Sequence, residues 1–197
     1  MKNNKLSIVI PILNENKNLF NLTEKILRYT NKLNLEIIFV DDNSNDGSDL
    51  TLNKLSQKYK NVKYFIRTKK KDLTKSCFYG IKKSKNKTIM IMDGDGQHNP
   101  RYIEKMYKIF ISKKIDFLVG VRNFNKIGKS LNYLRYMTSR LLIYIFKISF
   151  TLKTSDPMSG FFIFKKNFFL RNKNNFYGKG YKILADFIYS TNENLKI

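Results

Sequence analysis

Acidic residues are scarce in this 197-residue chain, which has 15 Asp and Glu against 38 Lys and Arg and therefore a formal net charge of +23. A positive field of this size attracts polyanions such as nucleic acid, anionic lipid or sugar nucleotides. Lysine and asparagine are abundant along the whole sequence, however, which is typical of a coding DNA with biased base composition. The charge therefore supports an anionic ligand without identifying one.

Cysteine and histidine are almost missing, since Cys77 and His98 are the only residues of their kinds. A single cysteine excludes an intramolecular disulfide, and we expect a reducing compartment. A single histidine excludes a metal site built from several histidines, so carboxylates must supply any metal ligation. We interpret Cys77 as a packing residue and His98 as a residue that orients its loop.

Long apolar runs are also missing. No stretch of eighteen uncharged apolar residues occurs, so the sequence predicts no membrane-spanning helix. The residues after Met1 lack the apolar core of a signal peptide, and we expect a cytoplasmic protein. A hydrophobic fraction of 42% is still enough to build the core of one domain.

Short apolar runs alternate with amphipathic segments along most of the chain. Buried strands are predicted at Leu6–Ile12, Glu36–Val40, Val62–Ile66, Thr88–Met92 and Asp116–Val121. Helices are predicted after Asn14, over Leu50–Tyr59, over Leu73–Lys83 and from Pro100 onward. This alternation is typical of a single α/β domain with a mainly parallel sheet flanked by helices.

The later third of the chain has a different pattern. The segment from Leu131 to Phe150 is rich in Leu, Ile, Tyr and Phe but is interrupted by Arg135, Arg140 and Lys147. Its length and charge predict an amphipathic helix. Such a helix lies either on a membrane surface or on the core with a basic exposed face, and the sequence leaves both possibilities open.

The scarce acidic residues gather directly after predicted strands. Glu15 follows the first strand, the pair Asp41 and Asp42 follows the second, and Asp93 and Asp95 follow the fourth. Because ligands of open α/β sheets bind beyond the carboxyl ends of the strands, we expect these acids to converge at one edge. Like charges brought together are costly unless a cation or a polar ligand is held among them.

The segment from Asp93 to Gln97 is the strongest candidate for that cation site. Its two carboxylates are one residue apart, glycines free the backbone around them, and Gln97 adds a neutral oxygen. Ligation by oxygen alone suits Mg²⁺ or Mn²⁺, which also bind diphosphate oxygens. We therefore predict Asp93, Asp95 and Gln97 as metal ligands.

Five segments resemble, in the expected order, the family 2 glycosyltransferases of GT-A fold. The first three are LSIVIPILNE (6–15), FVDDNSNDG (39–47) and MDGDGQHNP (92–100). Two more, VGVR (119–122) and SDPMSGF (155–161), resemble the polyprenyl-phosphate sugar transferases of the dolichol-phosphate mannosyltransferase type. The resemblance covers nearly the whole chain and implies a Rossmann-like GT-A domain.

The resemblance also implies roles for individual residues, including a nucleoside pocket at Pro11, Glu15, Val40 and Asp42. The implied donor-binding residues are Pro11, Glu15, Val40, Asp42, Asp93, Gly94, Asp95, Gln97 and Arg122. The implied acceptor-side residues are Asp156, Ser159 and Gly160, and the implied catalytic residues are Asp95, Arg122, Asp156 and Asp186. The same resemblance implies that residues from about 1 to 122 form the part that binds the nucleotide sugar. Residues from about 123 to 197 would form the acceptor-side part.

The sequence departs from the family pattern at two places. Family members often have Thr-Tyr where this chain has Ile12-Leu13, so we expect no stacking of a base on that tyrosine. They also continue, beyond the position of Ile197, into a segment whose Arg and Lys contact the donor phosphates. We therefore expect a domain truncated at its C-terminal end.

The leading prediction is metal-dependent, inverting transfer of a hexose from a GDP-mannose or UDP-glucose type donor to a polyprenyl phosphate. Peripheral contact with the cytoplasmic face of the membrane is expected through the segment from Leu131 to Phe150. One alternative is a saccharide or other hydroxyl acceptor, for which Asp156 or Asp186 would act as general base. Another is an inactive donor-binding domain. Nucleic-acid binding is not predicted, because no recognition pattern accompanies the charge, and the oligomeric state is left open.

Overall fold

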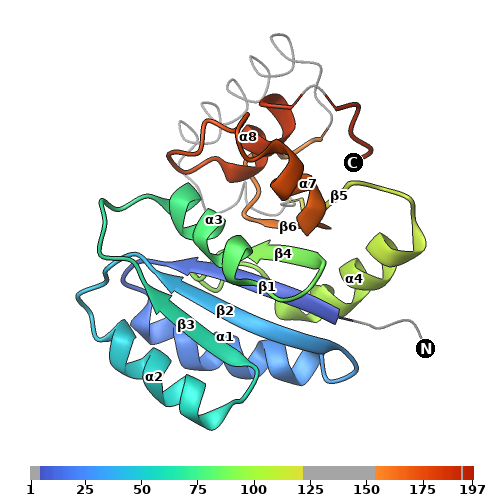
Figure 1. Ribbon diagram of the computed structural model, residues 1–197. Helices are drawn as coiled ribbons and strands as arrows, with labels where there is room; N and C mark the ends of the chain where they lie inside the picture. The colour runs from blue at the N-terminus through green and yellow to red at the C-terminus, as the bar shows by residue number, and fades with distance from the viewer. Residues whose placement is uncertain (1–4, 122–153, 192) are drawn as a thin grey trace, which may run out of the picture.

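The computed structural model describes residues 5–121, 154–191 and 193–197, and it shows one sheet between two layers of helices (Figure 1). The strands are β1 (Lys5–Ile12), β2 (Asn34–Asp41), β3 (Val62–Ile66), β4 (Thr88–Met92), β5 (Phe117–Val119) and β6 (Phe161–Lys165). The helices are α1 (Asn16–Tyr29), α2 (Ser48–Lys58), α3 (Leu73–Lys83), the 3₁₀ helix η1 (Pro100–Tyr102), α4 (Ile103–Ser112), α7 (Lys166–Asn172) and α8 (Ile183–Tyr189). The predicted α/β domain is confirmed.

The sheet has the order β3-β2-β1-β4-β6-β5, and its first four strands are parallel. Strands β1 and β2 pair along eight residues, from Lys5 opposite Asn34 to Ile12 opposite Asp41. Both strands are buried after their first residue, as expected for parallel strands that are covered by helices on both faces. The five predicted strands are all present, with ends within two residues of the prediction.

Strand β6 was not predicted by the sequence analysis, and neither were the helices α7 and α8 that follow it. It lies between β4 and β5 and runs antiparallel to both. Its four buried residues are all apolar because helices cover both faces of the sheet, so the strand shows no alternating pattern. Because β6 runs against β4, the residues that precede Phe161 lie at the edge where β4 ends.

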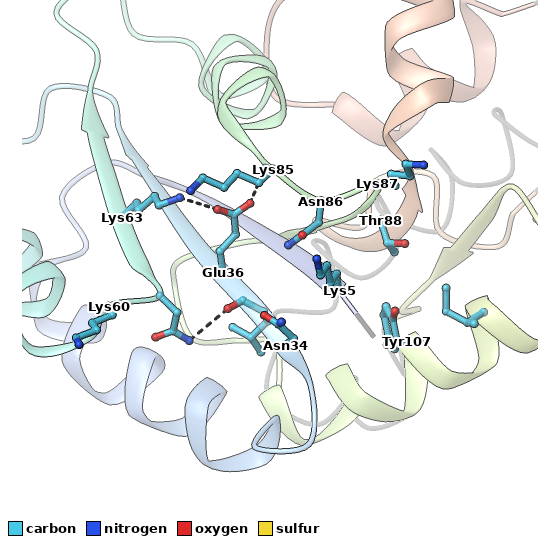
Figure 2. Close-up of a pocket in the computed structure, with 13 residues that line it drawn as sticks. Lys5, Asn34, Glu36, Lys60, Lys63, Lys85, Asn86, Lys87, Thr88 and Tyr107 are labelled. Atoms are coloured by element: carbon cyan, nitrogen blue, oxygen red, sulfur yellow. Dashed lines mark hydrogen bonds and ion pairs between the residues drawn. The ribbon is translucent and has the colours of Figure 1, made fainter. Parts of the chain in front are cut away.

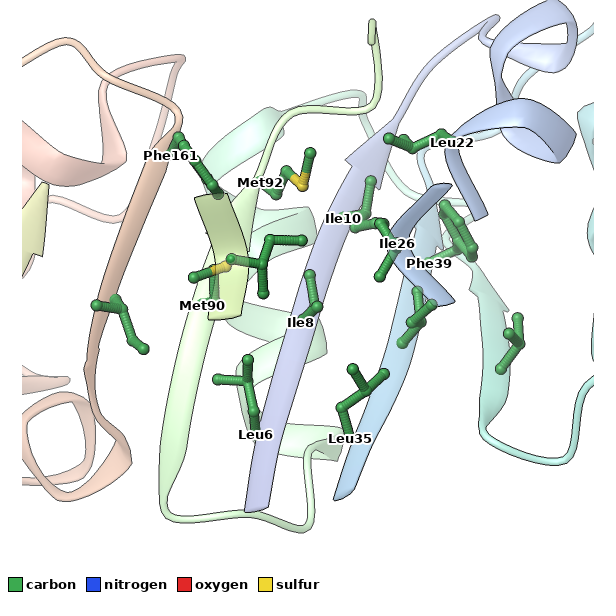
Figure 3. Close-up of a cluster of buried hydrophobic side chains, with 14 of the residues drawn as sticks. Leu6, Ile8, Ile10, Leu22, Ile26, Leu35, Phe39, Met90, Met92 and Phe161 are labelled. Atoms are coloured by element: carbon green, nitrogen blue, oxygen red, sulfur yellow. The ribbon is translucent and has the colours of Figure 1, made fainter. Parts of the chain in front are cut away.

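Helices cover the two faces with separate apolar clusters. Leu6, Ile8 and Ile10 of β1 pack on one face against Leu22 and Ile26 of α1 (Figure 3). The intervening side chains point to the other face, as the two-residue period of a strand requires. That second cluster joins the sheet to α3, α7 and α8 and is rich in phenylalanine: Phe117, Phe162, Phe164, Phe168, Phe169, Phe176 and Phe187.

A buried carboxylate fixes the amino-terminal edge of the sheet. Glu36 Oε1 accepts hydrogen bonds from Ser7 Oγ (2.7 Å) and from the Lys85 N–H (2.6 Å), and its Oε2 accepts one from Lys63 Nζ (2.9 Å). Burial would raise the pKa of Glu36, but these hydrogen bonds and the charge of Lys63 together outweigh it and lower the pKa. The ionised form of Glu36 therefore stabilises the fold.

The Glu36→Gln variant tests this contribution through its pH dependence. A carboxyl whose pKa is lowered in the folded state stabilises the protein above its unfolded pKa of about 4.3, and this stabilisation is lost as the pH falls through the folded pKa. The difference in free energy of unfolding between wild type and variant, measured by urea denaturation, should therefore shrink between pH 7 and pH 3. A difference of the same size at both pH values would contradict the role. Glu24→Gln, at a surface pair with Lys58, is the control.

Two predictions fall on residues outside the described part of the chain. They are the amphipathic helix from Leu131 to Phe150, which contains three basic residues, and the phosphate contact of Arg122. Among the helices that are described, none has the length and apolar character needed to cross a bilayer.

Candidate active site

The predicted acidic residues lie at one edge of the sheet, where β1, β2 and β4 end (Figure 1). The loops after β1 and β2 are hydrogen-bonded to each other there. The Asn14 N–H donates to Ser44 Oγ (2.8 Å), and the Asn16 N–H donates to Asp46 Oδ2 (2.9 Å). Asp41 accepts hydrogen bonds from the backbone and hydroxyl of Ser44, so it shapes the second loop.

Asp93 is the residue where the predicted donor and acceptor sides meet. Its N–H donates to the Gly160 carbonyl (3.1 Å), and a Cβ on Gly160 would overlap the Asp93 carboxylate. Only glycine therefore leaves room for that carboxylate. His98 Nε2 lies 3.4 Å from Asp93 Oδ2, and the His98 ring stacks on Phe161 with 5.1 Å between centroids. The Asp93 side chain keeps 34% of its surface exposed, which leaves it open to a ligand.

Asp95 and Gln97 are exposed on the loop that follows Asp93. Asp95 Oδ1 accepts a hydrogen bond from the Gln97 N–H (2.9 Å), which closes a tight turn. Gly94 is buried, and a Cβ there would lie 2.6 Å from Ile12 Cγ2, so the absence of a side chain lets this loop leave the sheet close to β1. The turn presents Asp95 to solvent, two residues after Asp93.

These residues fit a hard divalent cation. The side chains of Asp93, Asp95 and Gln97 offer oxygen atoms as candidate ligands: four carboxylate oxygens and one amide carbonyl oxygen. Within the residues that the structure describes, no three His, Cys, Asp or Glu side chains are grouped closely enough to hold a metal alone. Mg²⁺ typically binds through one or two carboxylates, several waters and substrate phosphates. The pair Asp93 and Asp95 suits that arrangement.

Asp42 is buried in an ion pair rather than open at the edge. It pairs with Arg67, which follows β3 and is 8% exposed, and its second oxygen accepts a hydrogen bond from the Asp72 N–H. Arg67 Nη1 also donates to Ser76 Oγ (2.9 Å). The Asp42 carboxylate therefore holds the loop between β3 and α3.

Replacing Arg67 by methionine should destabilise the fold by about 3–5 kcal/mol, because Asp42 would keep a buried charge without its partner. Urea denaturation measures this loss. Arg171→Met is the matched control, since Arg171 pairs with Glu193 at the surface, where both side chains are well exposed. We expect the control to cost less than about 1 kcal/mol. Equal losses in the two variants would contradict the structural role of the buried pair.

Asp72 extends the same network to the later part of the chain. Its Oδ1 caps α3 by accepting from the Lys75 N–H (3.0 Å), and its Oδ2 accepts from the Gly180 N–H (2.9 Å). Thr74 donates to the Gly180 carbonyl from both its N–H (3.0 Å) and its hydroxyl (2.9 Å). Gly180 has a φ of +89°, a conformation that favours glycine. Asp72 thus joins the loop before α3 to the loop before α8.

Asp186 and Ser159 both hold loops in place. Asp186 accepts hydrogen bonds from the N–H groups of Tyr177 and Gly178, both at 2.8 Å, and from the Ser190 hydroxyl (2.7 Å). Ser159 Oγ donates to the Gly120 carbonyl at the end of β5 (2.6 Å). These contacts give Asp186 and Ser159 a positioning role.

The turn from Pro157 to Gly160 forms one wall of a small pocket of about 40 Å³. Asp156 is 3% exposed and accepts a hydrogen bond from the Ser159 N–H through its carbonyl (3.2 Å). Asp93 and Cys77 line the same pocket. Burial raises the pKa of the Cys77 thiol well above its ordinary value, and the charges of Asp93, Asp72 and Asp42 raise it further. Burial and the three negative charges therefore both favour the neutral thiol at Cys77.

The four residues predicted for the nucleoside pocket differ in burial and in the element to which they belong. Val40 is fully buried beneath α3, where a Cβ on Gly80 would lie 3.0 Å from its Cγ2, so its side chain belongs to the core. Pro11 is also buried, within β1. Glu15 lies at the start of α1 and accepts a hydrogen bond from Asn18 Nδ2 (2.6 Å). A groove of about 410 Å³ runs between α1 and the loop that contains Asp95.

Arg67 and Asp72 belong to the buried network around Asp42, and the sequence analysis missed both. Arg67 directly follows the predicted strand Val62–Ile66, so the same reasoning about strand ends points to it. Asp72 directly precedes the predicted helix Leu73–Lys83, where an aspartate is a preferred N-cap. The end of a strand and the start of a helix are both local features of the sequence. Neither feature predicts which distant residue will pair with Arg67 or with Asp72.

The fold and the acidic edge together are typical of domains that transfer a sugar from a nucleotide sugar. The model of the family described as Glycosyl transferase family 2 matches residues 7–173, and the chain belongs to that family.

Curated relatives named dolichol-phosphate mannosyltransferase are similar to the chain. The Pyrococcus furiosus protein is 36% identical over 166 residues, which cover 82% of this chain and 46% of that protein. The Saccharomyces cerevisiae protein is 28% identical over 191 residues, which cover 92% of this chain and 69% of that protein. The chain thus spans about half the length of the first relative.

Solved structures at low identity confirm the GT-A fold. Glucosyl-3-phosphoglycerate synthase from Mycobacterium tuberculosis, in complex with Mn²⁺, UDP-glucose and phosphoglyceric acid, superposes with a TM-score of 0.71 at 12% identity and covers 98% of this chain and 66% of its own. The mannosyltransferase PcManGT from Pyrobaculum calidifontis, in complex with GDP-Man and Mn²⁺, gives a TM-score of 0.66 at 12% identity, covering 92% and 50%.

Proposed function

We propose that this chain is the catalytic domain of a metal-dependent glycosyltransferase that transfers a hexose from a nucleotide sugar to a polyprenyl phosphate. The observation that carries the proposal is the contact between Asp93 and Gly160, which joins the candidate metal loop to the candidate acceptor turn. The relatives named dolichol-phosphate mannosyltransferase support the acceptor. The neighbours that contain Mn²⁺ with UDP-glucose or GDP-Man support the cofactor and the donor class, with Mg²⁺ as the alternative ion.

In the proposed reaction, the bond from the anomeric carbon to the donor diphosphate breaks and a bond to an acceptor phosphate oxygen forms, with inversion. Asp93, Asp95 and Gln97 would hold a divalent cation that offsets the charge of the leaving nucleoside diphosphate. Arg122, outside the described residues, is proposed to contact the phosphates. Glu15 would contact the donor at the start of α1.

The acceptor side requires positioning more than proton transfer. A phosphate acceptor is already an anionic nucleophile, so it needs orientation rather than a general base. The hydrogen bonds of Asp186 agree with this requirement, because its oxygens accept from the loop at Tyr177 and Gly178. Asp156 and Ser159 would act by fixing the turn that ends at Gly160.

Transfer assays with labelled GDP-mannose and UDP-glucose test the proposal. With Mn²⁺ present, we expect label to move to a short-chain polyprenyl phosphate and not to simple saccharides. An Asp95→Ala variant should lose the activity. Transfer to saccharides alone would replace the proposed acceptor by a hydroxyl acceptor. The absence of both transfer and donor hydrolysis would instead support an inactive donor-binding domain.

We propose that the reaction takes place at the cytoplasmic face of a membrane, with which the protein makes peripheral contact. The basic and aromatic segment from Leu131 to Phe150 would supply that contact. Each basic residue near an anionic membrane surface would contribute about 1 kcal/mol to the free energy of membrane binding. Flotation with vesicles that contain anionic lipid tests it. Failure to float at physiological salt would count against membrane contact and leave the transfer reaction untouched.

A further inference from the structure

A groove of about 650 Å³ lies at the amino-terminal edge of the sheet, where β1, β2 and β4 begin (Figure 2). Lys5, Asn34 and Thr88, the first residues of these strands, all line it. Strand β1 has eight residues, which separate this groove from the acidic edge by roughly 25 Å. A ligand in the groove would therefore not touch Asp93 or Asp95.

The charges that line the groove are almost all positive. Its side chains include one carboxylate, Glu36, and five lysines: Lys5, Lys60, Lys63, Lys85 and Lys87. Glu36 is paired with Lys63 at 2.9 Å, so this pair is neutral. The other four lysines have exposed side chains, and in residues 5–121, 154–191 and 193–197 none of them forms an ion pair. Four uncompensated charges therefore surround one groove.

The backbone that carries these lysines is held by hydrogen bonds to neighbouring strands. The Lys85 N–H donates to Glu36, and the Asn86 N–H donates to Ser7 Oγ (3.3 Å). The loop at Lys60 is held by its neighbour Asn61, whose carbonyl accepts from the Ile37 N–H (2.8 Å). In Figure 2, Lys63 and Lys85 lie on the same side of Glu36, and Lys60 and Lys87 lie toward opposite ends of the groove. The charges are thus presented from anchored turns.

We propose that this groove is a second anion site, separate from the candidate active site, which binds a ligand with two or more phosphate groups. Unpaired like charges repel each other, and a polyanion relieves that repulsion. Lysine binds phosphate as a point charge, and the amides of Asn34 and Asn86 add neutral donors. The volume is in the range of sites for small ligands, about 300–1,000 Å³. The proposal does not depend on the proposed transfer reaction.

Titration with inorganic tripolyphosphate tests the site, in EDTA so that no metal can hold the probe at Asp93. Calorimetry should show salt-dependent binding to wild type. The double variant Lys5→Gln/Lys85→Gln should bind about 25-fold more weakly, at about fivefold for each charge removed. The control Lys54→Gln/Lys173→Gln has the same net charge but alters exposed lysines outside the groove. It should bind within about twofold of wild type.

Three outcomes would overturn the proposal: no binding at physiological salt, equal weakening in both double variants, or full affinity in the groove variant. A second arm identifies the source of the phosphates, using phosphatidylcholine vesicles with and without phosphatidylinositol bisphosphate, whose headgroup has several phosphates. If the groove variant also loses vesicle binding, the site takes a lipid headgroup. If vesicle binding is unchanged while tripolyphosphate binding falls, the site takes a soluble ligand. Unchanged melting temperatures show that the variants fold.

Discussion

The Asp93→Asn variant should transfer sugar with a kcat/KM at least about a thousandfold below that of wild type. The change removes one negative charge from the candidate cation site and keeps the shape of the side chain. A bound cation contributes several kcal/mol to the stabilisation of a developing charge, and about 1.4 kcal/mol corresponds to each factor of ten in rate. Steady-state assays with Mn²⁺ and a nucleotide sugar measure the loss.

The control for this variant is Asp49→Asn, which removes the same charge from an exposed position in the first turn of α2. It should keep kcat/KM within about threefold of wild type, because a helix-terminal charge contributes only about 0.3–1 kcal/mol to stability. Activity of Asp93→Asn above one tenth of the wild-type value would contradict the assignment of Asp93. Raising the Mn²⁺ concentration should restore part of the activity if the defect lies in metal affinity.

The Gly160→Ala variant should weaken Mn²⁺ binding by about 10–100-fold, the usual effect of displacing a residue that orients a metal ligand. The added methyl group would occupy the space of the Asp93 carboxylate, which must then rotate away. The overpacking should cost about 1–3 kcal/mol, which leaves a protein of ordinary stability folded. Calorimetric titration with Mn²⁺ in the presence of donor measures the affinity.

A double-mutant cycle separates this mechanism from a general disturbance of the turn. In an Asp93→Ala background the carboxylate is absent, so Gly160→Ala should weaken Mn²⁺ binding no further. Independent, additive losses from the two substitutions would show that Gly160 does not act through Asp93. The wild-type melting temperature provides the check on folding for all three variants.

The reasoning about strand ends predicted the edge of the sheet correctly, because it rests on local patterns. Each of the four parallel strands was visible as an apolar run, and Asp41 and Asp93 follow from the position of those runs. The contact between Asp93 and Gly160 could not be predicted in this way. It depends on β6, whose unbroken apolar sequence does not indicate a direction, and on its pairing with β4 across 69 or more residues of chain.

The role of Asp42 shows a second limit of sequence reasoning. The family resemblance implied a contact of Asp42 with the nucleoside, and the structure shows that its carboxylate pairs with Arg67. In a chain with 38 basic residues, spacing alone does not indicate which of them will neutralise a given acid. The resemblance likewise implied Val40 in the nucleoside pocket, and the structure places its side chain in the core.

The insertion of β6 between β4 and β5 has a consequence for synthesis on the ribosome. Until residues 161–165 emerge, the side of β4 that pairs with β6 has no neighbouring strand, and its backbone N–H and C=O groups stay unpaired. Such an open strand can pair with other nascent chains. At about 5–20 residues per second, the interval from Met92 to Lys165 lasts several seconds. We therefore expect the unpaired edge of β4 to be a site of wrong pairing during this interval.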